Sequence, residues 1–174
     1  MTSCVKTIDM EDEKEYITWS NGIINYKGTP FTGKLVDYYD GDKTKLSETG
    51  TVQDGKPEGT FLSYYSDGQL KEERTFKDGK KDGIYVRYYE NGQLEEKRTY
   101  KDGELNGPFE NYYENGQLEK KGTFKDGGYD GIYEYYFENG QLKIKENYKD
   151  GKNDGISEYY FENGQLKIKE NYKD

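Results

Sequence analysis

Five copies of Gly-Gln-Leu, beginning at residues 68, 92, 116, 140 and 164, stand 24 residues apart. Each copy follows an aromatic pair, and the first four are each followed by Lys-Asp-Gly. A fixed period in the range of roughly 20 to 50 residues marks stacked supersecondary units that bury their faces against one another. The chain is therefore predicted to be a repeat array, and its architecture can be derived from one unit.

One period predicts two strands. Residues 84–89 are rich in β-branched and aromatic side chains and lead into Asn91-Gly92, and a return strand follows over residues 94–100. Asn-Gly and Asp-Gly between such segments favour type I′ turns, which need positive φ at both central positions. Asp102-Gly103 supplies the second turn. The predicted fold is all-β: an elongated antiparallel array of β-hairpins forming one twisted meander sheet.

The two faces of this sheet are predicted to differ. A two-residue turn at Asn91-Gly92 places Tyr89 opposite Leu94, and side chains alternate between faces along a strand. The face with Tyr85, Tyr89, Leu94 and Tyr100 is predicted to be packed. The other face is predicted to be wetter and to present a tyrosine column among Lys and Glu, and these tyrosines are the candidate partner-binding residues: Tyr64, Tyr88, Tyr112, Tyr136 and Tyr160.

The chain divides by pattern into three parts. Residues 34–174 carry the hairpin repeats, with two extra residues in the turn near Gly41. Residues 19–33 are predicted to be an atypical half repeat that caps the array. Residues 1–18 are predicted to be a polar segment or tether. At the other end, the strand over residues 165–172 is expected to be a bare edge, which suggests an edge-to-edge homo-oligomer.

Composition restricts the partners. Only 30% of the residues are hydrophobic and 35% are charged, so a thick core is excluded, while 16% aromatic residues separate the chain from disordered sequences. The net charge of −9 argues against nucleic acid and makes a basic partner easier to accommodate. No apolar run reaches the roughly 18 residues of a spanning helix, so no transmembrane segment is predicted.

The single cysteine, Cys4, excludes an internal disulfide framework. Residues 1–4 look like the end of a bacterial lipoprotein box, which makes Cys4 a candidate lipid anchor if a signal peptide precedes it. The alternative is an ordinary cytoplasmic start with an incidental cysteine. Localisation stays open at this point.

Enzymatic function is not predicted. The chain has no His, and its lone Cys is near the terminus, so common activated nucleophiles cannot be assembled. Asp150 to Gly155 superficially matches a calcium loop, but Lys152 stands where an oxygen ligand is needed. No catalytic residue, metal site or cofactor is expected.

Residues 112–127, Tyr-Tyr-Glu-Asn-Gly-Gln-Leu and then Lys-Gly-Thr-Phe-Lys-Asp-Gly, resemble the bacterial MORN-repeat variant. The start, Pro30 to Leu35 followed by Tyr38-Tyr39, resembles the start of YwqK-family proteins, which are named as antitoxins. The resemblance implies hairpin sheets that serve as scaffolds for protein or membrane association, without catalytic residues. We therefore expect a non-enzymatic scaffold that binds another protein. The alternatives are an antitoxin neutralising a basic toxin and a surface-anchored lipoprotein spacer or adhesin.

Overall fold

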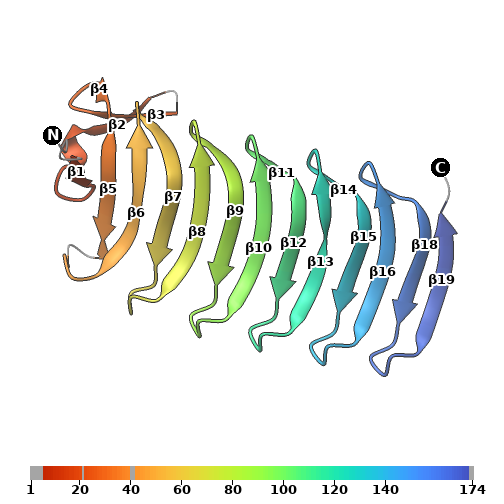
Figure 1. Ribbon diagram of the computed structural model, residues 1–174. Helices are drawn as coiled ribbons and strands as arrows, with labels where there is room; N and C mark the ends of the chain where they lie inside the picture. Colours follow the sequence, from red (N-terminus) through yellow and green to blue (C-terminus); the bar gives the residue numbers. More distant parts are fainter. Residues whose placement is uncertain (1–5, 21, 40–41, 173–174) are drawn as a thin grey trace. The chain divides into compact units, whose positions relative to one another are not determined.

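The computed structural model describes residues 6–20, 22–39 and 42–172 (Figure 1). Most of the described residues lie in β-strands, as predicted, and a short 3-10 turn, η1 (Lys14–Tyr16), precedes β2. The chain forms two compact units, Met1–Gly83 and Ile84–Asp174. The boundary falls inside strand β9 (Lys80–Tyr88).

Unit 1 contains a main sheet and a smaller one. Strands β5 to β8 pair antiparallel in chain order, and β1 adds to β5 in parallel. Strands β2, β3 and β4 form a separate three-stranded sheet. The strands are β1 (Thr7–Asp9), β2 (Ile17–Ser20), β3 (Ile23–Tyr26), β4 (Thr29–Pro30), β5 (Gly33–Tyr38), β6 (Leu46–Gln53), β7 (Lys56–Tyr64) and β8 (Leu70–Lys77).

Unit 2 is a meander of hairpins. Its long strands pair antiparallel in the order β10-β12-β13-β15-β16-β18-β19, and the short strands β11, β14 and β17 extend the turns on β10, β13 and β16. The strands are β10 (Leu94–Lys101), β11 (Glu104–Leu105), β12 (Gly107–Tyr112), β13 (Leu118–Lys125), β14 (Gly128–Tyr129), β15 (Gly131–Tyr136), β16 (Leu142–Lys149), β17 (Lys152–Asn153), β18 (Gly155–Tyr160) and β19 (Leu166–Tyr172).

The Asp-Gly turns have the predicted geometry. Asp102 has φ of 52° and Gly103 has φ of 95°, and the other Asp-Gly pairs of the repeats are alike. Two successive residues with positive φ define a type I′ turn, whose twist matches that of the flanking strands. Lys101 and Glu104 close the turn as facing residues. The prediction of two-residue turns at Asp-Gly is confirmed.

The Asn-Gly connections differ from the prediction. Among the described residues of these connections only the glycine has positive φ, 83° at Gly116. The Tyr113 N–H bonds to the Gln117 carbonyl at 2.8 Å, and the Gly116 N–H bonds to the Tyr113 carbonyl at 2.8 Å. This is a three-residue connection, a type I turn followed by a left-handed glycine. Tyr112 faces Leu118, so the predicted pairing of the second tyrosine with leucine, stated for Tyr89, was wrong by one residue.

Neighbouring Asn-Gly connections stack on one another. The Asn115 Oδ1 accepts the Gln117 N–H at 2.9 Å, while its Nδ2 donates to the Glu138 carbonyl of the next repeat at 3.4 Å. A Cβ on Gly140 would lie 2.9 Å from the Gln117 Oε1. Asparagine thus links two repeats, and glycine provides both the positive φ and the space for the preceding glutamine. The Gly-Gln pair recurs because it is a stacking contact.

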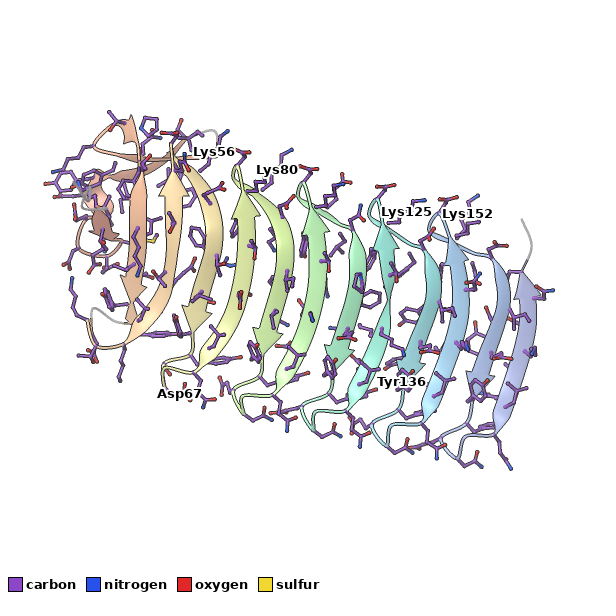
Figure 2. The ribbon with its side chains drawn as sticks, viewed as in Figure 1. Lys56, Asp67, Lys80, Lys125, Tyr136 and Lys152 are labelled. Atoms are coloured by element: carbon purple, nitrogen blue, oxygen red, sulfur yellow. The ribbon has the colours of Figure 1, made fainter. Side chains whose placement is uncertain are left out.

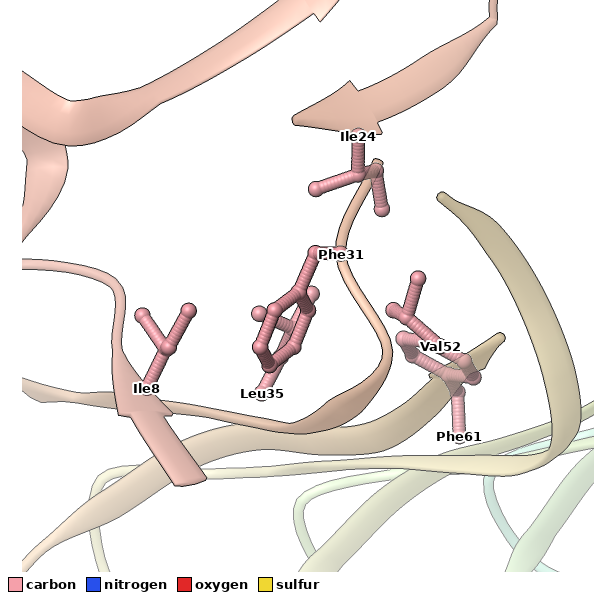
Figure 3. Packing of buried hydrophobic residues seen from close by; sticks show 6 residues of the cluster. All are labelled: Ile8, Ile24, Phe31, Leu35, Val52 and Phe61. Carbon is pink, nitrogen blue, oxygen red and sulfur yellow. The ribbon is translucent and has the colours of Figure 1, made fainter. Parts of the chain in front are cut away.

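The core of unit 1 corrects the expected N-terminal division. Ile8 on β1 is fully buried and joins Ile24, Phe31, Leu35, Val52 and Phe61 in one cluster (Figure 3). Residues 7–18 are therefore folded against unit 1 rather than a tether, because pairing of β1 with β5 buries the one apolar side chain of Thr7–Asp9. Residues 19–33 contribute to the small sheet and supply Ile24 and Phe31 to the core, instead of forming half a hairpin repeat.

The aromatic part of the predicted packed face is confirmed in unit 2, whereas Leu118, the equivalent of Leu94, is paired with Tyr112 of the other face. Tyr85 and Phe109 are only 7% and 3% exposed. Aromatic rings continue the packing from strand to strand, with ring centroids 4.9 Å apart for Phe109 and Phe124 and 4.6 Å apart for Phe124 and Tyr129. Such aromatic contacts stabilise a sheet beyond the effect of the area they bury. The opposite face is left free for other roles.

Gly50 provides a test of the packing in unit 1. A Cβ at Gly50 would lie 2.3 Å from a ring carbon of buried Phe61. We expect Gly50→Ala to lower the free energy of unfolding by about 2 kcal/mol or more, because overpacking forces the ring or the strand to move. Thr51→Ala, at the exposed neighbouring position, is the control and should cost clearly less. Equal denaturation midpoints for the two variants would contradict the packing.

Candidate interaction surface

Three of the predicted partner-binding tyrosines occupy equivalent places in unit 2. Tyr112, Tyr136 and Tyr160 end β12, β15 and β18. Their hydroxyls donate to the carboxylates of Glu110, Glu134 and Glu158, each two residues earlier, at 2.9, 2.7 and 3.0 Å. Residues two apart share a face of a strand. The rings are therefore held in place on the wetter face, and we call these three residues the tyrosine column.

The other two predicted tyrosines occupy related positions. Tyr64 ends β7 in unit 1, and Leu62 stands where the tyrosine column has a glutamate. Tyr88 ends β9. The structure therefore places all five predicted residues at strand ends, but the glutamate contact is described for three of them.

The second tyrosines of two Tyr-Tyr pairs, Tyr89 and Tyr113, have a structural role that the sequence did not predict. The Tyr89 hydroxyl donates to the Tyr112 carbonyl at 2.7 Å, and the Tyr113 hydroxyl donates to the Tyr136 carbonyl at 2.7 Å. Each bond joins one repeat to the next. Burial raises the pKa of Tyr89, and burial followed by the neighbouring Tyr135 raises that of Tyr113. These hydroxyls remain donors at neutral pH.

A ladder of alternating charges crosses the same face as the tyrosine column. Cross-strand pairing places lysine and glutamate opposite each other on seven neighbouring strands of unit 2. Lys121 bonds Glu134 at 2.9 Å, and Lys169 bonds Glu158 at 2.7 Å. The members of this Lys/Glu ladder, in strand order, are Lys97, Glu110, Lys121, Glu134, Lys145, Glu158 and Lys169.

The two charges of the ladder differ in exposure. The side chains of Lys121, Lys145 and Lys169 are 41–52% exposed, whereas Glu134 and Glu158 are 16% and 21% exposed. The ammonium groups therefore form the outer part of the ladder and the carboxylates lie beneath them. The pairs are partly solvated, so each adds little to stability. They fix where the charges stand on the face.

Hydrogen bonding favours the ionised form of two ladder carboxylates, Glu134 and Glu158. Burial opposes ionisation of Glu134, but hydrogen bonds from Lys121 and Tyr136 outweigh it and lower the pKa. Hydrogen bonds from Lys169 and Tyr160 lower the pKa of Glu158. Burial, with Glu134 as its acceptor, raises the pKa of Tyr136. At neutral pH Tyr136 and Tyr160 are protonated donors, and Glu134 and Glu158 are charged acceptors.

A row of hollows runs beside the ladder. Pro108, Ile132 and Ile156 stand two residues before the ladder glutamates, and Ile132 and Ile156 are 55% and 48% exposed. A hollow of about 370 Å³ lies between Pro108 and Ile132, and one of about 500 Å³ lies between Ile132 and Ile156. Lys121 and Lys145 line them as well. Successive hollows share Ile132, so they form one row, and we call them the hollow row.

The tyrosine column, the Lys/Glu ladder and the hollow row together are the interaction face. Figure 2 labels Tyr136 near one end of the strands of unit 2, whereas Lys125 and Lys152 lie at the Asp-Gly end. A 24-residue recurrence of Glu at 110, 134 and 158 and of Lys at 97, 121, 145 and 169 was the sequence signal for the ladder. Predicting the ladder from this recurrence would also have required the strand register.

The remaining sequence predictions concern Cys4, the turn insertion, metal binding and membrane segments. Cys4, the candidate lipid anchor, and Gly41, in the predicted turn insertion, lie outside the described residues. Within residues 6–20, 22–39 and 42–172, no group of three or more His, Cys, Asp or Glu side chains is arranged to hold a metal ion. A search of the same residues finds no helix with the length and apolar character needed to span a membrane.

Stacked antiparallel hairpins with one aromatic face define a β-repeat protein. The MORN repeat variant family matches residues 57–78, 81–102, 105–126, 129–150 and 153–174, and this chain belongs to that family. No curated protein matches the chain. Among solved structures, it is similar to a crystal structure of the GtfA/B complex bound to UDP and GlcNAc, at 14% identity and a TM-score of 0.21. That match covers 83% of this chain and about a quarter, 24%, of the other.

The two tyrosines of each pair should respond differently to loss of the hydroxyl. We expect Tyr113→Phe to lower the free energy of unfolding by about 1 kcal/mol, because the Tyr136 carbonyl loses its inter-repeat donor. Tyr112→Phe removes a bond to a carboxylate of its own strand and should cost less. Denaturant titration of both variants measures the difference. A larger effect for Tyr112→Phe would reverse the assignment.

Acid should weaken the ladder. Because the folded pKa of Glu134 is below its ordinary value of 4.5, its contribution to stability is complete above that value and is lost as the pH falls through the lowered one. We expect Glu134→Gln to flatten the decline of unfolding free energy between about pH 6 and pH 3. Glu162→Gln, at an exposed loop position, is the control and should follow the wild-type profile. Parallel profiles for all three proteins would refute this role.

Proposed function

We propose that this protein is a non-enzymatic repeat scaffold that binds another protein through its interaction face. MORN repeats commonly serve in protein interaction or membrane binding, and the family is a non-enzymatic repeat family. The observation that carries the proposal is the tyrosine column, whose rings are fixed by their glutamates before any partner arrives. Rigid tyrosines provide contact area at low entropic cost.

The surroundings of the column support protein binding. Exposed Ile132 and Ile156 provide apolar contacts, and the Lys/Glu ladder provides charges at defined places. Apolar and aromatic anchors surrounded by polar groups are typical of protein interfaces. The ladder exposes its lysines more than its glutamates, so this face does not favour the strongly basic partner of an antitoxin.

Substitutions in the tyrosine column test the proposed function. We expect replacement of Tyr112, Tyr136 and Tyr160 by serine to abolish capture of the protein partner, whereas replacement by phenylalanine should retain most of it, because the rings supply most of the contact area. Quantitative pull-down of the partner with each purified variant measures this. Circular dichroism of each variant should show an unchanged β-sheet spectrum.

A matched control uses exposed tyrosines elsewhere. Tyr16 and Tyr172 are 42% and 40% exposed and lie outside the column. A Tyr16→Ser, Tyr172→Ser variant should capture the partner like the wild type. If the serine variant of the column also captures it at the wild-type level, the interaction face is not the binding surface.

A further inference from the structure

The spacing of the interaction face suggests the conformation of its partner. Equivalent residues of successive repeats are separated by two strands, which is about 9.6 Å at 4.8 Å per strand. We infer that the face binds a proline-rich segment in the polyproline II conformation, lying across the strands with three residues per repeat. This inference rests on the proposed function and specifies its ligand.

Polyproline II fits this spacing best among regular conformations. It has three residues per turn and advances about 9.3 Å per turn, so every third side chain points the same way. Over three repeats the mismatch with the face is about 1 Å. An α-helix presents one side chain per heptad about every 10.5 Å, which drifts by about 3 Å over the same distance. Alternate residues of an extended strand recur about every 6.8 Å, which does not match the spacing of about 9.6 Å between repeats.

The hollow row provides places for the apolar side chains. Each hollow lies between two apolar side chains that are one repeat apart, Pro108 and Ile132 or Ile132 and Ile156. One proline pair per turn would enter one hollow per repeat. Because the polyproline helix is preformed, little conformational entropy is lost on binding.

The Lys/Glu ladder complements the remaining positions. A polyproline II segment has no internal hydrogen bonds, so its carbonyls are free to accept. The exposed ammonium groups of Lys121, Lys145 and Lys169 recur once per repeat, and Lys121 and Lys145 line the hollows. They can bond a carbonyl or a carboxylate of every third residue. The best ligand is therefore a proline-rich segment with an acidic residue at every third position.

Designed peptides test this inference. We expect a fluorescein-labelled peptide of five Glu-Pro-Pro repeats to bind the full chain about tenfold more tightly than a peptide of the same composition with its glutamates irregularly spaced. A helical peptide with one Glu per heptad should also bind more weakly. Fluorescence anisotropy at low and at physiological salt measures the affinities. Equal affinities, no binding of the Glu-Pro-Pro peptide, or tighter binding of the helical peptide would overturn the inference.

Variants locate the binding. We expect an Ile132→Asn, Ile156→Asn variant to lose about tenfold in affinity for the Glu-Pro-Pro peptide. Both side chains are about half exposed, so we expect their replacement to leave the sheet folded, as checked by circular dichroism. Phe161→Asn is the control, because Phe161 is equally exposed at 48% but lies outside the hollow row. Equal affinity of the two variants would place the peptide elsewhere.

Failure of this inference is distinguishable from failure of the proposed function. If column-dependent capture of a protein partner persists while no Glu-Pro-Pro peptide binds, the face is an interaction surface for another conformation. If the serine variant of the tyrosine column captures the partner normally, the proposed function itself fails.

Discussion

The stacking of each hairpin on the next, at a constant advance of two strands, is the constraint on which the rest of unit 2 depends. In residues 84–172 no second layer covers the sheet, so each repeat is stabilised by its contacts with the neighbouring repeats. Backbone pairing supplies the main contact, and the Asn-Gly connections add side-chain bonds such as that from Asn115 to the Glu138 carbonyl. Because the advance is constant, any residue that recurs in sequence becomes a column in space.

In this arrangement the two faces of the sheet have different roles. Aromatic packing around Phe109 and Phe124 stabilises one face, and the hydroxyls of Tyr89 and Tyr113 bond neighbouring repeats to each other. The other face carries partly solvated ion pairs and exposed isoleucines that contribute little to folding. A face that contributes less to stability is available for a partner. Its contacts recur at the same interval as the hairpins, so a partner with a matching periodicity can use several repeats at once.

The sequence predicted the repeat, the hairpin and the packed face, because each depends on local signals. Asp102-Gly103 adopts the predicted type I′ turn since both residues tolerate positive φ. Asn115-Gly116 carries the same local signal but forms a longer turn, in which Asn115 bonds both the Gln117 N–H and the next repeat. The burial of Ile8 could not be predicted from the sequence either. Its neighbours are polar, and only a parallel pairing with β5, distant in sequence, covers it.

The sequence by itself determined that this protein is a β-hairpin repeat array of the MORN type with one aromatic face, since period, turn residues and alternation are properties of the chain. Tertiary structure alone decided which residues face each other across strands. A one-residue difference at the Asn-Gly connection makes Tyr112 rather than Tyr113 the partner of Leu118. The register across the strands likewise brings Lys121 and Glu134 together in the ladder. Cross-strand neighbours depend on the register, and the register is set by the turn that each hairpin adopts and by the pairing of successive hairpins.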